Sequence, residues 1–377
     1  MLERLKRTAT AIDNEFVRSW KNDHGKVVGY TCTFIPEEII HAAGLLPYRL
    51  RGIQTTSLSI GDSYYGPVNC SLPKCMLQLA GQGAYMFLDG AIISNGCDSM
   101  RRLEECWRKA SEDYEGTLPA YYEFFSVPHK SVDYSIDFYA EELRDMIATL
   151  EKHFKVSIPA KALKQSIMVY NQGRQLLKKL DDLRFRRNVP ITGENAMAIL
   201  IAGHAMPRET FNAMLEEIID HLEKASPVAN KQKRLMLVGS ANDDVEFIRL
   251  IEDCGAIVVA DTVCFGSRTY AHMVADETDP VHSLATHYLT NSVCPRMLGY
   301  YKDRRSYIAD TAKKALVDGI ILQNVRFCDL HGSENGVLER DLEAAGIPCM
   351  RLEREYGPLV ETGRIRMRLD AFMERIS

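Results

Sequence analysis

Short apolar runs alternate with helical patterns in two separate parts of the chain. The first part contains the apolar runs KVVGYTCTF, LPYRL and FLDGAIISNGCD, with the helical pattern PEEIIHAAG between the first two. The second part begins near residue 231 and contains the runs KRLMLVGS, AIVVAD, GIILQNVRF and IPCMRLE, again separated by helical patterns. Strands that alternate with helices in this way predict parallel, doubly wound sheets. We therefore expect an α/β protein with two Rossmann- or flavodoxin-like lobes.

A helical segment separates the two parts. Between residues 136 and 230, apolar residues recur at spacings of three and four, as in IDFYAEELRDMIATLEKHF and ETFNAMLEEIIDHLEKA. This pattern predicts three regions: an N-terminal α/β lobe at residues 1–135, a helical connecting region at 136–230 and a C-terminal α/β lobe at 231–377.

Composition narrows the classes of function. The chain has 377 residues, of which 46% are hydrophobic and 26% are charged, so it resembles neither a disordered nor a fibrous protein. Forty-six basic and fifty-one acidic residues give a net charge of −5, which argues against nucleic acid as a partner. The start MLERLKRTATAIDNEF has no apolar core of a signal peptide, and no run approaches the roughly 18 apolar residues of a membrane span. We expect a cytoplasmic protein with no membrane partner.

The ten cysteines do not fall at random. In a reducing compartment they serve as core residues, nucleophiles or ligands of soft metals rather than as disulfides. Four cysteines directly follow predicted strands, where open α/β sheets form their ligand crevice, and they come from both lobes. These are Cys32, Cys97, Cys264 and Cys328, whereas Cys70, Cys75 and Cys294 lie in predicted loops. If the lobes face each other, these thiols converge, although composition and placement alone leave packing as an equal alternative.

Other motifs add little. The chain contains no GxxxxGK[ST] phosphate loop, no GxGxxG after a strand and no HExxH zinc motif, and none of the loop cysteines forms a CxxC pair. Glu37 and Glu38 follow Pro36 at the start of a helix, where acidic residues stabilise the first turn. Glu37 is also close in sequence to Cys32 and is therefore a candidate general acid or base.

Four stretches together carry a resemblance to a known family. They are GYTCTFIPEEIIHAAGLLPYRLRG, NCSLPKCMLQLAGQGAYMFLDGAIISNGCDSMRRL, VVADTVCFGSRTY and NVRFCDLHG with the following ERDLEAAGIPCMRLE. In this order the chain resembles the 2-hydroxyacyl-CoA dehydratase and benzoyl-CoA reductase family, and specifically a smaller subunit of the catalytic component. The resemblance implies two α/β lobes with a 4Fe-4S cluster between them and a dimer, usually of two related subunits. It also implies a separate ATP-hydrolysing iron–sulfur activator that supplies electrons.

The resemblance also implies a set of cluster ligands. Carried over by position, these are Cys70, Cys97 and Cys328, with Cys32 as a fourth ligand or a close neighbour. Three ligands would leave one iron open for an acyl-CoA, whereas four would make the cluster a pure electron carrier. Cys75 competes with Cys70 for the loop position. Further thiols, Cys264 and Cys294, leave a second cluster or a fused double-cubane cluster as an alternative, although this chain lacks a cysteine before GAYMFLDG that such relatives have.

The reaction implied by the resemblance is the dehydration of a 2-hydroxyacyl-CoA. One electron enters the thioester carbonyl, and the resulting ketyl radical expels hydroxide and acidifies the β-proton. The enzymatic alternative is a benzoyl-CoA reductase-type subunit, in which the electron begins ring reduction. The non-enzymatic alternative is an electron-carrier subunit, and the sequence leaves open whether the assembly is a homodimer or a heterodimer.

Overall fold

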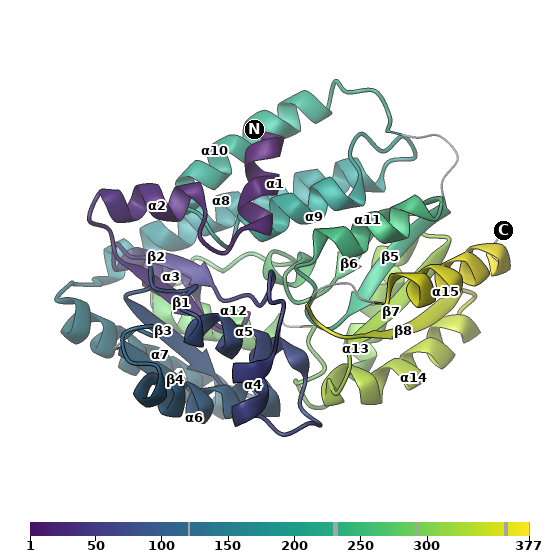
Figure 1. Ribbon diagram of the computed structural model, residues 1–377. Coiled ribbons are helices and arrows are strands. Elements are labelled where there is room, and N and C mark those ends of the chain that lie inside the picture. The colour runs from purple at the N-terminus through teal and green to yellow at the C-terminus, as the bar shows by residue number, and fades with distance from the viewer. Residues whose placement is uncertain (120, 229–232, 292, 358–360, 377) are drawn as a thin grey trace.

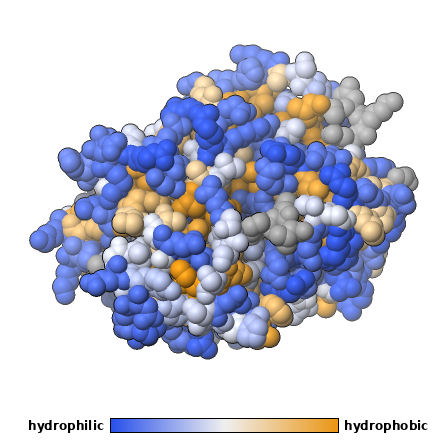
Figure 2. Space-filling view, in the orientation of Figure 1, coloured by the Kyte–Doolittle hydropathy of each residue, from blue (hydrophilic) through white to orange (hydrophobic). Residues whose placement is uncertain are grey.

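Two four-stranded parallel sheets lie side by side, and long helices cross above both of them (Figure 1). The computed structural model describes residues 1–119, 121–228, 233–291, 293–357 and 361–376. Within these residues no helix is long and apolar enough to cross a membrane. Figure 2 shows one face of the molecule, on which hydrophilic residues predominate and hydrophobic residues form small separate groups.

Both sheets have the same strand order. The first runs β2-β1-β3-β4 and the second runs β6-β5-β7-β8, so each lobe places its first strand beside its second and third. Such an order reverses direction between the first and third strands, and ligands bind at this switch point beyond the carboxyl ends of the strands. The expected α/β architecture with two doubly wound lobes is confirmed. The strands are β1 (Val27–Tyr30), β2 (Leu46–Arg49), β3 (Gly90–Ser94), β4 (Tyr121–Phe125), β5 (Lys233–Gly239), β6 (Ala256–Thr262), β7 (Gly319–Val325) and β8 (Cys349–Arg354).

Apolar faces hold the helices against the sheets. In α7 the buried residues Tyr139, Leu143, Met146 and Leu150 are spaced by four, three and four positions, and they share a core with β1 and β3. The helices that accompany the first sheet are α3 (Glu37–Ala42), α4 (Ser59–Tyr64), α5 (Ser71–Gly81), α6 (Asp98–Asp113), α7 (Asp133–Phe154) and α12 (Pro280–Thr290). Those that accompany the second are α11 (Val245–Asp253), α13 (Tyr301–Lys314), α14 (Asp329–Ala344) and α15 (Thr362–Arg375), with the 3₁₀ turn η1 (Ser267–Thr269).

The helical region joins both lobes. Helix α1 packs on α9, although it precedes the first sheet in the sequence, and Leu5 and Ala9 belong to the core of the helical region. Conversely, the sequence pattern assigns α7 to the helical region, whereas this helix covers the first sheet. The remaining helices are α1 (Leu2–Thr10), α2 (Glu15–Asn22), α8 (Ala160–Phe185), α9 (Gly193–Ala202) and α10 (Arg208–Leu222).

The two lobes also share a hydrophobic core at their seam. Leu72 and Met76 of α5 belong to the same cluster of buried side chains as Phe265, Val325 and Tyr356 of the second lobe. Close packing across a seam of this kind fixes the position of one lobe against the other. The carboxyl ends of strands from both sheets therefore meet in a defined geometry.

One helix begins earlier than the sequence pattern indicates. The apolar pattern in GVLERDLEAAG places the start of α14 near Gly336, and Asp329 and Gly332 suit a tight turn after Cys328. In the structure α14 begins at Asp329, and the Gly332 N–H already donates to the Cys328 carbonyl in a helical bond of 2.8 Å. The first two turns of α14 are mostly polar, so they carry little apolar periodicity, but Asp329 in the first turn suits the positive end of the helix dipole. Cys328 thus precedes a helix rather than a turn.

Candidate functional site

Three of the predicted cysteine ligands occupy the same structural position. Cys70, Cys97 and Cys328 are the residues immediately before α5, α6 and α14. Burial raises the pKa of all three thiols, and in each case a backbone N–H in the first turn of the helix bonds to the thiol and opposes this rise, because that hydrogen bond favours the thiolate. The helix dipole acts in the same direction. Each of the three sulfurs therefore has an amide donor directed at it from a helix N-terminus.

These thiols and Cys32 lie close together. Burial raises the pKa of the Cys97 thiol well above its ordinary value, and Cys70, Cys328 and Cys32 raise it further by electrostatic repulsion. Cys32 lies against Gly96, the residue that precedes Cys97. If Gly96 carried a Cβ atom, that atom would be only 2.7 Å from Cys32 Sγ. The structure thus brings together the four cysteines that the resemblance selected, three from the first lobe and one from the second.

Two further thiols join this group from the part of the chain that follows β6. Burial raises the pKa of Cys294 to about 12, and the neighbouring thiols Cys264 and Cys32 contribute to the shift. Cys264 likewise raises the pKa of Cys328, which burial brings to about 11. We call the set Cys32, Cys70, Cys97, Cys264, Cys294 and Cys328 the thiol crevice.

Cys75 points elsewhere. It lies more than one helical turn after Cys70 in α5, and its Sγ is 3.8 Å from the carbonyl oxygen of Tyr356. Cys75 also packs closely against Gly52, because a Cβ atom added to Gly52 would be only 2.4 Å from Cys75 Cβ. Cys75 therefore fills the space between α5 and the chain after β2. Five residues along a helix turn a side chain by about 140°, which explains why Cys70 and Cys75 face different surroundings.

Two arginines border the thiol crevice. Arg268 Nη1 donates to Cys264 Sγ at 3.3 Å, Arg268 Nη2 donates to the Gly239 carbonyl at 2.9 Å, and the guanidinium also opposes the raised pKa of Cys294. On the other side, Arg296 donates to carbonyl oxygens of neighbouring loops, and the thiols of Cys32 and Cys294 raise its pKa against the effect of burial. The sequence analysis selected neither residue, although Arg268 follows Cys264 by four positions and Arg296 follows Cys294 by two.

A third arginine ties the two lobes together beside the thiols. Arg49 Nη1 donates to the Cys264 carbonyl at 2.7 Å, and Arg49 Nη2 donates to Thr33 Oγ1 at 2.9 Å. Its guanidinium stacks over the ring of Phe265 at 4.0 Å. The loop after β1 and the loop after β6 are therefore held in register, and this register places Cys32 and Cys264 on the same crevice.

The thiols of the crevice are residues that could hold an iron–sulfur cluster. Among the described residues, no three His, Cys, Asp or Glu side chains are grouped to hold one metal ion. A single zinc ion requires all its sulfur ligands at about 2.3 Å from one centre, whereas a four-iron cluster takes each thiolate on a different iron and so spaces them more widely. Largely buried thiols with amide and guanidinium donors suit an anionic cluster of this kind.

Glu37 has a different environment from the one expected of a general acid. Its carboxylate accepts from Arg208 Nη2 at 2.9 Å and lies 3.4 Å from His204 Nδ1. Although burial opposes ionisation, Arg208 and His204 hold the pKa of Glu37 well below its ordinary value. Its neighbour Glu38 accepts from Tyr288 at 2.7 Å and pairs with Arg174. Both glutamates thus connect α3 to α8, α10 and α12, and a catalytic role for Glu37 stays a prediction.

The chain is similar to known proteins that are named as subunits of CoA-thioester enzymes. The model of the family described as 2-hydroxyglutaryl-CoA dehydratase, D-component, matches residues 32–376. The chain is 25% identical to the (R)-phenyllactyl-CoA dehydratase beta subunit of Clostridium sporogenes, over 93% of this chain and 92% of that protein. It is 27% identical to a benzoyl-CoA reductase subunit of Thauera aromatica, over 84% and 83%. It is 21% identical to the (R)-2-hydroxyglutaryl-CoA dehydratase subunit beta of Acidaminococcus fermentans, over 97% of both chains.

Proposed function

Because the chain belongs to the 2-hydroxyglutaryl-CoA dehydratase D-component family, we propose that it is an iron–sulfur subunit of a radical (R)-2-hydroxyacyl-CoA dehydratase. The observation that carries this proposal is the convergence of largely buried thiols from both lobes, three of them at helix N-termini. Relatives named as beta subunits of dehydratases support a CoA thioester as the substrate and a related subunit as the partner. A separate ATP-hydrolysing activator would supply electrons, in keeping with the absence of a phosphate loop from this sequence.

The proposed reaction removes water without net oxidation. A 4Fe-4S cluster supplies single electrons at low potential. One electron added to the thioester carbonyl of a 2-hydroxyacyl-CoA gives a ketyl radical, and hydroxide then leaves from the 2-position. Loss of the acidified β-proton and return of the electron give the enoyl-CoA, so the same electron serves further turnovers.

The residues of this chain act by holding and shielding the site. Cys70, Cys97 and Cys328 would bind iron with Cys32 beside them, and the amides of the helix N-termini would donate to their sulfurs. Phe265 directly follows Cys264, is 1% exposed and belongs to the hydrophobic cluster against which Cys97 and Cys328 pack, so it would help to exclude water from the site. Exclusion of water prevents the loss of a reactive radical to side reactions.

Anaerobic purification followed by iron and sulfide analysis tests this proposal. We expect about four irons per chain and, after dithionite reduction, an EPR signal that changes with a 2-hydroxyacyl-CoA. The protein should be measured alone and after co-expression with its related subunit. A change with benzoyl-CoA alone would favour the reductase-type alternative, and absence of iron after anaerobic reconstitution would refute the proposal.

A larger cluster is a second candidate, because Cys264 and Cys294 also lie in the thiol crevice. Six thiols would be enough ligands for two clusters or for a fused double-cubane cluster. About eight irons per chain would support this arrangement. Four irons with no response to any acyl-CoA would instead favour an electron-carrier subunit.

Substitution of Arg268 is expected to change the reduction potential of the cluster. Arg268→Gln removes a positive charge and a hydrogen bond to Cys264 Sγ, so the reduced, more negative state loses stabilisation. We expect the midpoint potential in an EPR-monitored titration to fall by roughly 50 to 150 mV. Arg305→Gln removes the same charge from a half-exposed position on α13 and should leave the potential nearly unchanged. Equal potentials in the two variants would exclude Arg268 as a determinant.

A further inference from the structure

His331 lies in the first turn of α14 and contacts the thiol crevice in two ways. Its backbone N–H bonds to the Cys328 thiol and opposes the rise in the pKa of that thiol caused by burial. Its Nε2 lies 3.4 Å from Arg268 Nη1 and 3.5 Å from Arg268 Nη2. Arg268 in turn donates to Cys264 Sγ at 3.3 Å and to the Gly239 carbonyl at 2.9 Å. One residue therefore connects the loop of Cys328 with the loop of Cys264.

The contact with Arg268 assigns the tautomer of His331. A guanidinium has only N–H donors, so His331 Nε2 is the acceptor and the proton of the neutral ring lies on Nδ1. The ring is 5% exposed, and burial together with the positive charges of Arg268 and Arg304 holds the pKa of His331 well below its ordinary value. His331 thus offers Arg268 an acceptor that carries no charge.

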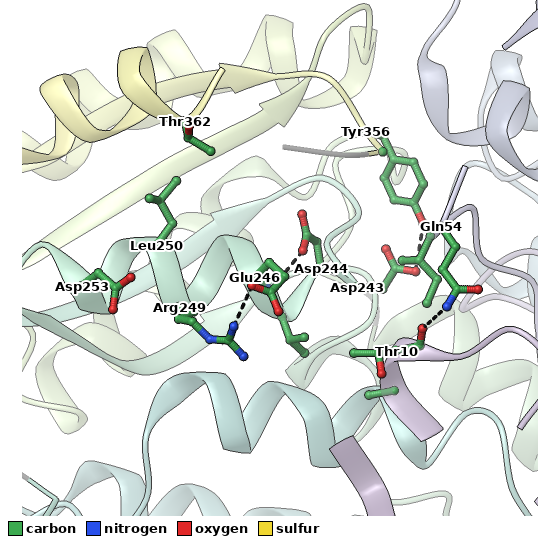
Figure 3. A pocket seen from close by; sticks show the side chains of 14 residues that line it. Thr10, Gln54, Asp243, Asp244, Glu246, Arg249, Leu250, Asp253, Tyr356 and Thr362 are labelled. Atoms are coloured by element: carbon green, nitrogen blue, oxygen red, sulfur yellow. Dashed lines mark hydrogen bonds and ion pairs between the residues drawn. The ribbon is translucent and has the colours of Figure 1, made fainter. Parts of the chain in front are cut away.

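Carboxylates serve as the acceptors of other arginines in this chain. Buried pairs of this kind are Arg174 with Glu38, Arg184 with Asp181 and Asp261, Arg208 with Glu37, and Arg304 with Glu334. Beside α11, Arg249 likewise donates to Glu246 at 2.8 Å (Figure 3). An adjacent carboxylate cancels much of the charge of a guanidinium. Among the described residues Arg268 contacts no carboxylate, so its charge acts undiminished on the sulfur beside it.

The same helix orders a second loop of the crevice. Glu334 lies one turn after His331 and accepts from Arg304 Nε at 3.2 Å and from Arg304 Nη2. Arg304 Nη1 donates to the carbonyls of Cys294 and Met297, at 3.3 and 3.0 Å. Helix α14 therefore holds one arginine with its charge cancelled at the Cys294 loop and another with its charge retained at Cys264.

We propose that His331 is a positioning residue that directs the Arg268 guanidinium at Cys264 Sγ and leaves its positive charge uncancelled. The inference rests on the proposed iron–sulfur function, in which Cys264 would bind iron or lie beside the cluster. A positive charge close to a cluster stabilises its reduced, more negative state, so His331 raises the reduction potential through Arg268. An apolar side chain at this position would remove the acceptor that orients the guanidinium, whereas the backbone N–H that bonds to Cys328 would stay in place.

A double-mutant cycle tests whether His331 acts through Arg268. The full chain and its variants are purified anaerobically, and their midpoint potentials are measured by EPR-monitored titration. We expect His331→Leu to lower the potential by at least about half of the fall that Arg268→Gln causes, and the double variant to fall no further than Arg268→Gln alone. Shifts that add in the double variant, or a wild-type potential in His331→Leu, would overturn the proposal.

His331→Gln is the matched control. Glutamine places a neutral amide oxygen near the position of Nε2, so this variant can still accept from Arg268 and should keep most of the wild-type potential. A role in packing alone would instead change the melting temperature of His331→Leu and leave its potential unaltered. A fall in the potential of His331→Gln as large as that of His331→Leu would also count against the proposal.

A third variant keeps the test decisive if His331→Leu does not fold. His331→Asn remains polar, but its amide ends near the position of Nδ1, so it should lower the potential as His331→Leu does. Crystal structures of the iron-free variants give a readout that needs no cluster. The Arg268 guanidinium should leave Cys264 Sγ in His331→Leu and His331→Asn and keep its place in His331→Gln, and an unmoved guanidinium in all three would refute the inference. If the wild-type chain binds no iron, the proposed function fails, and these structures still decide whether His331 positions Arg268.

Discussion

Replacing Cys70 by serine is expected to remove most of the iron from the anaerobically purified protein. Cys70 precedes α5. It lies close enough to Cys97 to raise the pKa of that thiol, and Cys328 in turn raises the pKa of Cys70. A hydroxyl is a far weaker ligand of iron than a thiolate, and the amides at the helix N-terminus cannot compensate for the lost bond. Iron content should fall from about four per chain to below about one, as measured by colorimetric iron analysis and loss of the EPR signal.

Cys75→Ser is the matched control for this change. Cys75 lies five residues later in the same helix, is also buried, and faces the Tyr356 carbonyl instead of the thiol crevice. It should retain its iron and its EPR signal, with a loss of stability of about 1 kcal/mol from the altered packing. Loss of iron in Cys75→Ser together with its retention in Cys70→Ser would reverse the assignment of the loop ligand.

Glu37→Gln is expected to destabilise the fold by about 3 to 5 kcal/mol and to lower the melting temperature by roughly 10 °C. The substitution leaves the buried guanidinium of Arg208 without the carboxylate that it contacts at 2.9 Å. An uncompensated buried charge costs far more than a lost surface pair. Calorimetry measures the effect, and the iron content should be retained if Glu37 holds the helices together and takes no part at the cluster.

Glu15→Gln provides the control, since Glu15 pairs with Arg4 at 3.1 Å on the surface and should change stability by less than about 1 kcal/mol. The pH dependence gives a second readout. Because the pKa of Glu37 is lower in the folded state than its ordinary value of 4.5, its stabilising effect is present above about pH 4.5 and is lost as the pH falls below it. Glu37→Gln should therefore weaken the acid dependence of stability. A variant with wild-type stability that has lost acyl-CoA turnover would instead support the general acid–base role.

Local patterns in the sequence determined the lobes and much of the site. Apolar runs such as GIILQNVRF in β7 and AIVVAD in β6 are buried throughout their strands because both faces of a parallel sheet are covered by helices. The alternation of such runs with helices leaves few arrangements other than doubly wound sheets. Strand exits meet at one edge of each sheet, so the positions of Cys32, Cys97, Cys264 and Cys328 after their strands already predicted the edge at which these thiols would lie.

Only the tertiary structure decided which thiols share the crevice and what surrounds them. Cys70 and Cys75 are alike in the sequence, but the direction of α5 sends their side chains into different surroundings. Glu37 is close to Cys32 along the chain, yet Arg208, 171 positions away, takes its carboxylate. Arg268 and Arg296 follow crevice cysteines closely in the sequence, but their positions are fixed by bonds to the distant carbonyls of Gly239, Asn95 and Pro128. Periodicity records which face of an element is buried, whereas the partner across a packed interface is fixed by how the two lobes and the helices assemble.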